Sequence, residues 1–289
     1  MSLQKWNDMY SIRPFGFANT GVICYFNAML QSFLSCTSVV ETIRNMPRVD
    51  RENNPLVNLI GQLIDSALNT RDDVAHFSPR IFAELMQQLR VQKKQYGRFG
   101  SGQEDSGEGF TIFLDALRLP VIERLFEHRY RHHITCGLCN YTHQIEADES
   151  IFIEITEQQS HNIERAIWNF DSAIDDNYKC TKCGCKGAKT KHTSMTMVPE
   201  ILVLLFIKFE KKWLLDAPRE LHVPSRSGPM FNYKLTSLVE HDGTATSGHY
   251  WAKCRRAGSR FAVLNDTSVT PLGALESSPK TYMAWYHIF

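Results

Sequence analysis

The sequence has almost no net charge and no long apolar run. Its 289 residues carry 32 Lys and Arg against 31 Asp and Glu, which leaves a formal net charge of +1 at pH 7. That balance gives no electrostatic reason to expect binding to nucleic acid or to a membrane. The longest apolar run, ILVLLFI at 201–207, is far too short to span a bilayer and suits a buried strand.

The first ten residues, MSLQKWNDMY, contain no apolar signal segment, and the chain shows no internal repeat or low-complexity stretch. Its eight cysteines are therefore expected to be thiols rather than disulfides. We expect an intracellular protein of the cytoplasm or the nucleus. A hydrophobic content of 43% and this length suit one large domain with sub-domains, or two domains.

Helical periodicity dominates the first part of the chain and β-like runs the rest. Apolar residues recur at spacings of three and four in 25–35, 54–69, 78–90 and 107–119, with Ser78 and Pro79 placed as N-cap and first residue of the third helix. Short β-like runs follow at 144–155, 200–209, 233–241, 249–255, 260–265 and 282–288. Helices before strands predict an α+β fold.

Two C-x-x-C pairs indicate a metal site. Cys136 and Cys139 form the first pair, and Cys180 and Cys183 form the second. Two such pairs can complete a tetrahedral set of four thiolates, which suits Zn²⁺. A closed site of this kind leaves no position for water, so we expect the zinc to be structural. Cys185 could compete with Cys183.

His192 is a weaker substitute ligand for the same ion. Cys24, Cys36 and Cys254 lie outside this set, and Cys36 is interpreted as a core residue.

Cys24 stands between a loop containing Gly16, Asn19 and Gly21 and the helix predicted from Tyr25. A thiol attacks only as thiolate, and the unpaired N–H groups of a helix N-terminus stabilise that anion. This position makes Cys24 a candidate nucleophile. The alternative is a buried apolar filler, a common role for cysteine.

A cysteine nucleophile needs a base and a group that orients the base. The segment SGHYWAKCRRAGSRFAVLND is interpreted as two strands joined by a turn around Ala257 and Gly258. A hairpin centred on residue 257 places His249 opposite Asn265 and Trp251 opposite Val263. The same register places Lys253 opposite Phe261.

In that register Asp266 faces the other side of the sheet, and a shift of one residue would exchange Asp266 with Asn265. Without a nucleophile nearby, His249 would be interpreted as a surface histidine. Asn19 could donate its side-chain N–H to a developing oxyanion beside the backbone N–H of Cys24. Alternatively, Asn19 caps a turn.

Cys24, Asn19 and His249 lie in two of five segments that occur in order along the chain: GFANTGVICYFNAMLQSFL (16–34), QEDSGEGFTIFLDAL (103–117), PEILVLLFIKF (199–209), YKLTSLVEHDGTATSGHYWAKC (233–254) and YMAWY (282–286). They resemble the sequence boxes of the ubiquitin-specific protease family of deubiquitinating enzymes, including its cysteine box and its histidine box. The two C-x-x-C pairs fall where that family has zinc-bearing fingers.

The resemblance implies Cys24 as nucleophile, His249 as base, Asn265 as third triad member with Asp266 as the alternative, and Asn19 as oxyanion donor. It also implies a papain-like cysteine protease of right-hand architecture. One catalytic domain over 1–289 would comprise a helical thumb to about 120, fingers with the zinc site at about 126–210 and a palm with the histidine box at about 211–289.

The family holds the arginines of the ubiquitin tail with acidic residues of the second box, which correspond here to Asp105 and Glu108. Local physics alone explains both as favourable acidic residues at a helix start. Tyr250 is expected to line the channel for the Gly-Gly end or to belong to the core. Val22 and Ile23 replace the usual Asn-Thr before the nucleophile, so the oxyanion site is expected to be less polar.

The resemblance implies a thiol-dependent deubiquitinase that hydrolyses the bond after the C-terminal glycine of ubiquitin. Its partners would be ubiquitin or ubiquitinated proteins, and neither nucleic acid nor a membrane. Three alternatives remain open at this point: a protease for a ubiquitin-like modifier, a ubiquitin-binding pseudoenzyme, and a nucleic-acid module built on the cysteine pairs.

Overall fold

The structure is a computed structural model in which residues 9–19, 21–75, 79–92, 102, 104–147, 149–172, 174, 177–186, 189–208, 213, 216–224, 230–244 and 247–289 are described. Ser78, the N-cap predicted for the third helix, lies outside these residues. Among the described residues, no helix has the length and apolar content needed to cross a bilayer.

Helices fill the first part of the chain, as the periodicity predicts. They are α2 (Cys24–Phe33), α3 (Thr37–Asn45), α4 (Arg48–Asn53), α5 (Pro55–Asn69), α6 (Pro79–Gln92), α7 (Ser106–Leu117) and α8 (Pro120–Phe126), followed later by α9 (Glu157–Ser160) and α10 (Ile163–Trp168). Asn54 caps α5 by accepting a hydrogen bond from the Val57 N–H, and Pro55 occupies the first turn.

Two sheets contain the strands. The smaller sheet has the order β2 (Thr142–Glu146), β1 (Arg129–Cys136), β5 (Lys189–Met197) and β4 (Asn169–Ser172). The larger sheet has the order β11 (Ser268–Leu272), β10 (Arg260–Asn265), β9 (Gly248–Arg256), β8 (Met230–Gly243), β12 (Thr281–Ile288), β6 (Ile201–Phe206) and β3 (Ile153–Ile155), with β7 (Glu220–Pro224) on β8. Helices first and mainly antiparallel strands after them confirm the α+β prediction.

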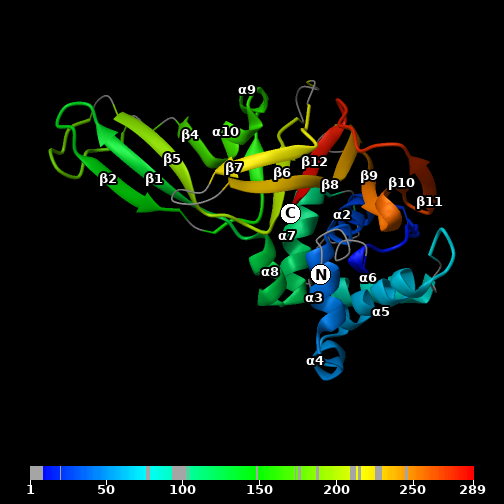
Figure 1. The fold of residues 1–289 in the computed structure, drawn as a ribbon. Helices are drawn as coiled ribbons and strands as arrows, with labels where there is room; N and C mark the ends of the chain where they lie inside the picture. The colour runs from blue at the N-terminus through cyan, green and yellow to red at the C-terminus, as the bar shows by residue number, and fades with distance from the viewer. Residues whose placement is uncertain are drawn as a thin grey trace.

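In Figure 1 the smaller sheet extends away from the helices α2 to α8, which gather along one side of the larger sheet. Both β3 and β6 belong to the larger sheet, although they lie within the stretch expected to form fingers. The division into thumb, fingers and palm stays a prediction.

The larger sheet is covered on both faces, because side chains alternate along a strand. On β6, Ile201, Val203 and Leu205 pack into the core shared with α2 and α7. The intervening Leu202 and Leu204 pack into a second core on the opposite face. A strand buried on both sides has a continuous apolar sequence, which explains the ILVLLF run.

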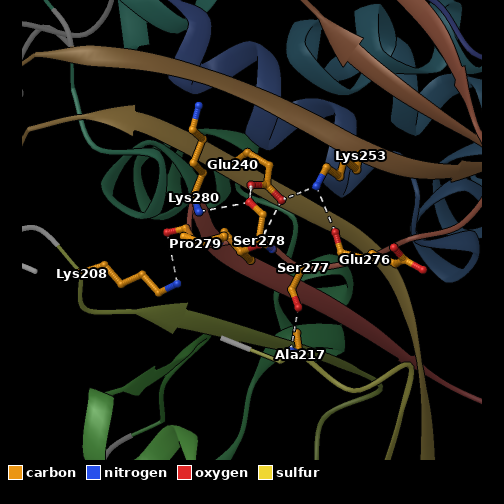
Figure 2. A network of polar contacts seen from close by, with 10 residues as sticks. Lys208, Ala217, Glu240, Lys253, Glu276, Ser277, Ser278, Pro279 and Lys280 are labelled. Carbon is orange, nitrogen blue, oxygen red and sulfur yellow. Dashed lines mark hydrogen bonds and ion pairs between the residues drawn. The ribbon is translucent and has the colours of Figure 1, made fainter. Parts of the chain in front are cut away.

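A buried carboxylate joins the strands next to the histidine box. Glu240 of β8 is fully buried, accepts hydrogen bonds from the Ser278 hydroxyl and from Thr281 Oγ1 at 3.0 Å, and forms an ion pair with Lys253 Nζ of β9 at 2.9 Å. Figure 2 shows the contacts of Glu240 with Ser278 and Lys253, with Lys253 also donating to the Glu276 carbonyl. The network therefore links β8, β9 and the start of β12.

Removing this carboxylate should destabilise the fold. The change Glu240→Ala leaves the Lys253 ammonium without its carboxylate and is expected to lower the free energy of unfolding by about 3 kcal/mol. Urea unfolding followed by circular dichroism measures the loss. The control Glu276→Ala removes only the exposed ion pair with Arg219 and should change stability by less than about 0.5 kcal/mol. Equal losses in the two variants would contradict a structural role for Glu240.

Candidate active site and metal centre

The loop before α2 is shaped by the side chain of Asn19. Its Oδ1 accepts from the Gly21 N–H at 2.9 Å and from the Ile23 N–H at 3.4 Å. Gly21 has a φ of 128°, a conformation that suits glycine. Ile23 is the N-cap residue and offers no side-chain cap, so Asn19 satisfies backbone donors at the helix start. Cys24 is the first residue of α2.

This loop is in close contact with the turn after β10. The Phe17 N–H donates to the Asp266 carbonyl at 2.8 Å. A Cβ atom on Gly16 would lie 2.5 Å from the Thr267 carbonyl oxygen, closer than any side chain permits. Gly16 therefore allows the nucleophile loop and the turn at 266–267 to touch. The sequence showed a glycine here but gave no sign of its neighbour.

Cys24 is packed against the strand that carries His249. Helix α2 contacts β9, on which Tyr250 follows His249, and the Tyr250 backbone lies close enough to Cys24 to act on the pKa of its thiol. Burial raises the pKa of the thiol, the Tyr250 N–H lowers it and the Asp266 carboxylate raises it, with a net upward direction. Cys24 is only 2% exposed. A favoured thiolate, expected from the helix start alone, is therefore not found here, because burial outweighs the backbone donors.

His249 and Asn265 meet, although the predicted register was wrong. Lys253 pairs with Val263 rather than with Phe261, a shift of two positions along the strand. The turn contains a short 3₁₀ segment, Ala257–Ser259, with Gly258 at a φ of 71°. A shift of two residues keeps side chains on the same face, so His249 and Asn265 become diagonal neighbours.

The His249 Nε2 lies 2.6 Å from the Asn265 Oδ1. An amide oxygen only accepts, so Nε2 carries the proton and the lone pair of neutral imidazole is on Nδ1. The site thus holds a histidine in a defined tautomer with a lone pair available to take up a proton.

Asp266, the residue after Asn265, is held by hydrogen bonds to two asparagine side chains. Its backbone has a φ of 49°, a left-handed conformation that Asp tolerates better than most residues. Its Oδ2 accepts from Asn19 Nδ2 at 3.0 Å and its Oδ1 from Asn27 Nδ2 at 2.7 Å. Asn19, which the sequence placed as an oxyanion donor, thus gives one of its two N–H groups to Asp266.

The proposed substrate-binding carboxylates have different surroundings. Asp105 is the N-cap of α7: its Oδ1 accepts from the N–H groups of Gly107 and Glu108 at 2.8 and 2.9 Å, and its Oδ2 accepts from the Tyr282 hydroxyl. Glu108 is exposed in the first turn of α7. Local capping therefore accounts for Asp105, and Tyr282 is a partner that the sequence did not indicate.

Tyr250 is buried, and its ring stacks on that of His241 with centroids 4.2 Å apart. Burial raises the pKa of its hydroxyl. Gly248 makes room for the same histidine, since a Cβ there would lie 2.2 Å from His241 Nε2. These contacts show that Gly248 and Tyr250 both pack against His241.

Cys136, Cys139, Cys180 and Cys183 converge at the end of the smaller sheet, with all four sulfurs within 4.8 Å of one another. The Cys139 and Cys180 sulfurs are 3.7 Å apart and those of Cys136 and Cys183 are 3.9 Å apart. Zinc bonds of about 2.3 Å in a tetrahedron place sulfurs about 3.8 Å apart, so the donor set fits this ion.

Cys185 lies beside this cluster. Its sulfur is 2.8 Å from that of Cys183 and 3.6 Å from that of Cys136. His192 instead forms a contact with Asp171, with 3.0 Å between Nδ1 and Oδ1. Five sulfurs therefore surround a site that needs four.

The sequence profile of the ubiquitin carboxyl-terminal hydrolase family matches residues 15–286. This chain belongs to that family. Among curated relatives, it is 21% identical over 194 residues to ubiquitin carboxyl-terminal hydrolase 8 of Saccharomyces cerevisiae, covering 58% of this chain and 41% of the relative. It is 22% identical over 297 residues to the probable ubiquitin carboxyl-terminal hydrolase 8 of Schizosaccharomyces pombe, covering 94% and 64%.

The human ubiquitin carboxyl-terminal hydrolase 2 is 28% identical over 134 residues, which cover 41% of this chain and 22% of that protein. The chain thus spans less than two thirds of the length of these relatives. Among solved structures, the SAGA Ubp8/Sgf11/Sus1/Sgf73 DUB module bound to ubiquitin aldehyde matches with a TM-score of 0.78 and 19% identity, over 97% of this chain and 70% of that one. The family predicted from the sequence boxes and the fold class are confirmed.

The charge of Asp266 should control the acidity of the Cys24 thiol. Replacing Asp266 with Asn removes a negative charge that raises the pKa of Cys24, so the thiol should ionise at lower pH. The measurement is the pH midpoint of iodoacetamide alkylation at Cys24, read by mass spectrometry of its peptide. Alkylation of Cys139 in the same samples is the internal control. An unchanged or higher midpoint for Cys24 would contradict the electrostatic argument.

Proposed function

We propose that this member of the family is a thiol-dependent deubiquitinase that hydrolyses the isopeptide or peptide bond after the C-terminal glycine of ubiquitin. The observation that carries the proposal is the packing of the Cys24 helix against β9, the strand on which Tyr250 follows a His249 that is oriented by Asn265. A nucleophile, a base and an orienting amide are the three groups that thiol hydrolysis needs.

In the proposed reaction the proton of Cys24 passes to His249 Nδ1, and the sulfur attacks the glycine carbonyl carbon. The oxyanion accepts hydrogen bonds from the Cys24 N–H and from the second N–H of Asn19. His249 then protonates the leaving amine as the carbon–nitrogen bond breaks. A water activated by His249 hydrolyses the resulting thioester and releases free Cys24.

Because the pKa of Cys24 is raised, the thiol in this scheme loses its proton only after the substrate has bound. In the structure the thiol is buried and neutral, so ionisation must accompany proton transfer to His249 rather than precede it. We propose that Asp105 and Glu108 contact the basic ubiquitin tail, with the Tyr282 hydroxyl fixing Asp105. The solved complexes of the similar DUB module with monoubiquitin and with ubiquitin aldehyde support ubiquitin as the partner.

Loss of the sulfur should separate binding from turnover. Cys24→Ala is expected to abolish cleavage of a fluorogenic ubiquitin substrate while leaving the affinity for ubiquitin within about twofold, because only the reacting atom is removed. Steady-state rates and fluorescence anisotropy measure the two quantities. Residual turnover at the wild-type rate would exclude Cys24 as the nucleophile.

Loss of the proposed oxyanion donor should have a smaller effect. Asn19→Ala is expected to lower kcat by roughly 10²–10³, the usual cost of one such donor. Steady-state kinetics measure this loss, and an unchanged kcat would exclude Asn19 as a donor.

A separate experiment tests the substrate class. It uses electrophilic probes built on ubiquitin and on ubiquitin-like modifiers, followed by mapping of the labelled residue. Labelling at Cys24 by another modifier alone would reassign the substrate, and the absence of any adduct would indicate a pseudoenzyme.

We further propose a structural zinc ion held by Cys136, Cys139, Cys180 and Cys183. Zinc would crosslink the two loops at the end of the smaller sheet and would supply no reacting group, because four thiolates close its coordination shell. Cys185 can replace Cys183, since their sulfurs are 2.8 Å apart.

Metal analysis of purified variants tests this ligand set. Cys139→Ala should lose zinc, whereas Cys183→Ala and Cys185→Ala should each retain about one ion per chain, and the double variant should lose it. Zinc in the double variant, or its loss from Cys183→Ala, would contradict the exchange between these two ligands.

None of the eight cysteines forms a disulfide, which supports a reducing compartment, the cytoplasm or the nucleus.

A further inference from the structure

Asn27 is a buried polar residue one turn into the nucleophile helix. It is 3% exposed and lies three residues after Cys24. Its Nδ2 donates to the Asp266 Oδ1 at 2.7 Å and, at the longer distance of 3.4 Å, to the Ala18 carbonyl. The other oxygen of the Asp266 carboxylate accepts from Asn19 Nδ2 at 3.0 Å. The Asp266 carboxylate therefore bridges two amides, one in the loop before α2 and one in α2 itself.

The orientation of the Asn27 amide follows from chemistry. An ionised carboxylate only accepts, so the NH₂ group of Asn27 must face Asp266. Its Oδ1 is then buried without a hydrogen-bond partner among the described residues. An unpaired buried acceptor is a cost to folding that an apolar side chain would avoid. A residue kept at that cost requires a role other than stability, and its contact with Asp266 is the candidate.

The backbone of Asp266 is fixed, so only its side chain is free to rotate. Its carbonyl is fixed by the Phe17 N–H at 2.8 Å, and its backbone is in the left-handed region. The side-chain torsions therefore decide where the acceptor for Asn19 lies. Asn27 determines these torsions, because its hydrogen bond holds the second carboxylate oxygen.

We propose that Asn27 is a positioning residue that acts through Asp266 to hold the Asn19 amide in place for the oxyanion. Asn19 has two N–H groups, and the bond to Asp266 uses one of them. Fixing that bond directs the other N–H. The inference rests on the proposed function, since it concerns the oxyanion of that reaction.

Three variants measure the effect of Asn27 on ubiquitin hydrolysis. Asn27→Ala should lower kcat by about 10- to 100-fold with KM within twofold, the scale of a lost hydrogen bond to a charged group. Asn27→Asp should be slower still, because it places a second carboxylate against Asp266. The control Ser32→Ala lies on the same helix, is also fully buried and has no contact with Asp266, so it should keep the wild-type kcat.

Two double variants separate positioning from a general structural role. If Asn27 acts through Asn19, the Asn19→Ala, Asn27→Ala variant should be no slower than Asn19→Ala alone. The double variant Asn27→Asp, Asp266→Asn should have a kcat at least tenfold higher than that of Asn27→Asp alone. In that pair the carboxylate accepts from the new amide, whose oxygen still accepts from Asn19. Thermal unfolding of every variant checks that each is folded.

An unchanged kcat in Asn27→Ala, or losses that simply multiply with those of Asn19→Ala, would overturn the inference while leaving the proposed function intact. If Asn27→Asp does not fold, the Asn19 and Asn27 alanine cycle still decides the question. A wild-type protein that neither cleaves ubiquitin substrates nor reacts with the ubiquitin probe would remove the proposed function, and this inference with it.

Discussion

The contact between the nucleophile loop and the turn after β10 is the constraint on which the site depends. Asp266 makes this contact with both its backbone carbonyl, which accepts from Phe17, and its carboxylate, which accepts from Asn19 and Asn27. Residues from the two ends of the sequence are thereby brought to one place. The same turn follows directly after Asn265, the partner of His249, so the orientation of His249 and the shape of the loop before Cys24 are determined together.

Reactivity and stability conflict at Cys24. The close packing that joins α2 to β9 also excludes water from the sulfur, and burial favours the neutral thiol. Backbone N–H donors lessen this effect, whereas the Asp266 charge increases it. The group that shapes the loop therefore also opposes ionisation of the Cys24 thiol.

Sequence periodicity was enough to predict α2, α5, α6 and α7, the central strands of the larger sheet and the α+β class, because both cores of that sheet depend on apolar spacing. The short helices α3, α4, α8, α9 and α10 were not predicted. The partnership of His249 with Asn265 was also predictable, since it required only that both side chains share a face. The register was not, because the 3₁₀ turn at Ala257–Ser259 shifts the pairing by two residues. Periodicity is blind to such a shift, which exchanges no faces.

Two features of the site could not be predicted for a different reason. The burial of Cys24 and the partners of Asn27 depend on contacts between residues more than 200 positions apart. Asn27 gave one local signal, a polar side chain within an apolar helix, but its meaning depends on Asp266. Asp105 shows the reverse case, because the capping role that local rules suggested is the one its contacts display.

Gly16 offers a genetic consequence. Its hydrogen atom faces the Thr267 backbone, where even a methyl group has no space. A substitution at this codon would push the loop before Cys24 away from the turn after β10 without altering Cys24, His249 or Asn265. Such an allele would help to show which cellular phenotypes require this contact rather than the mere presence of the polypeptide.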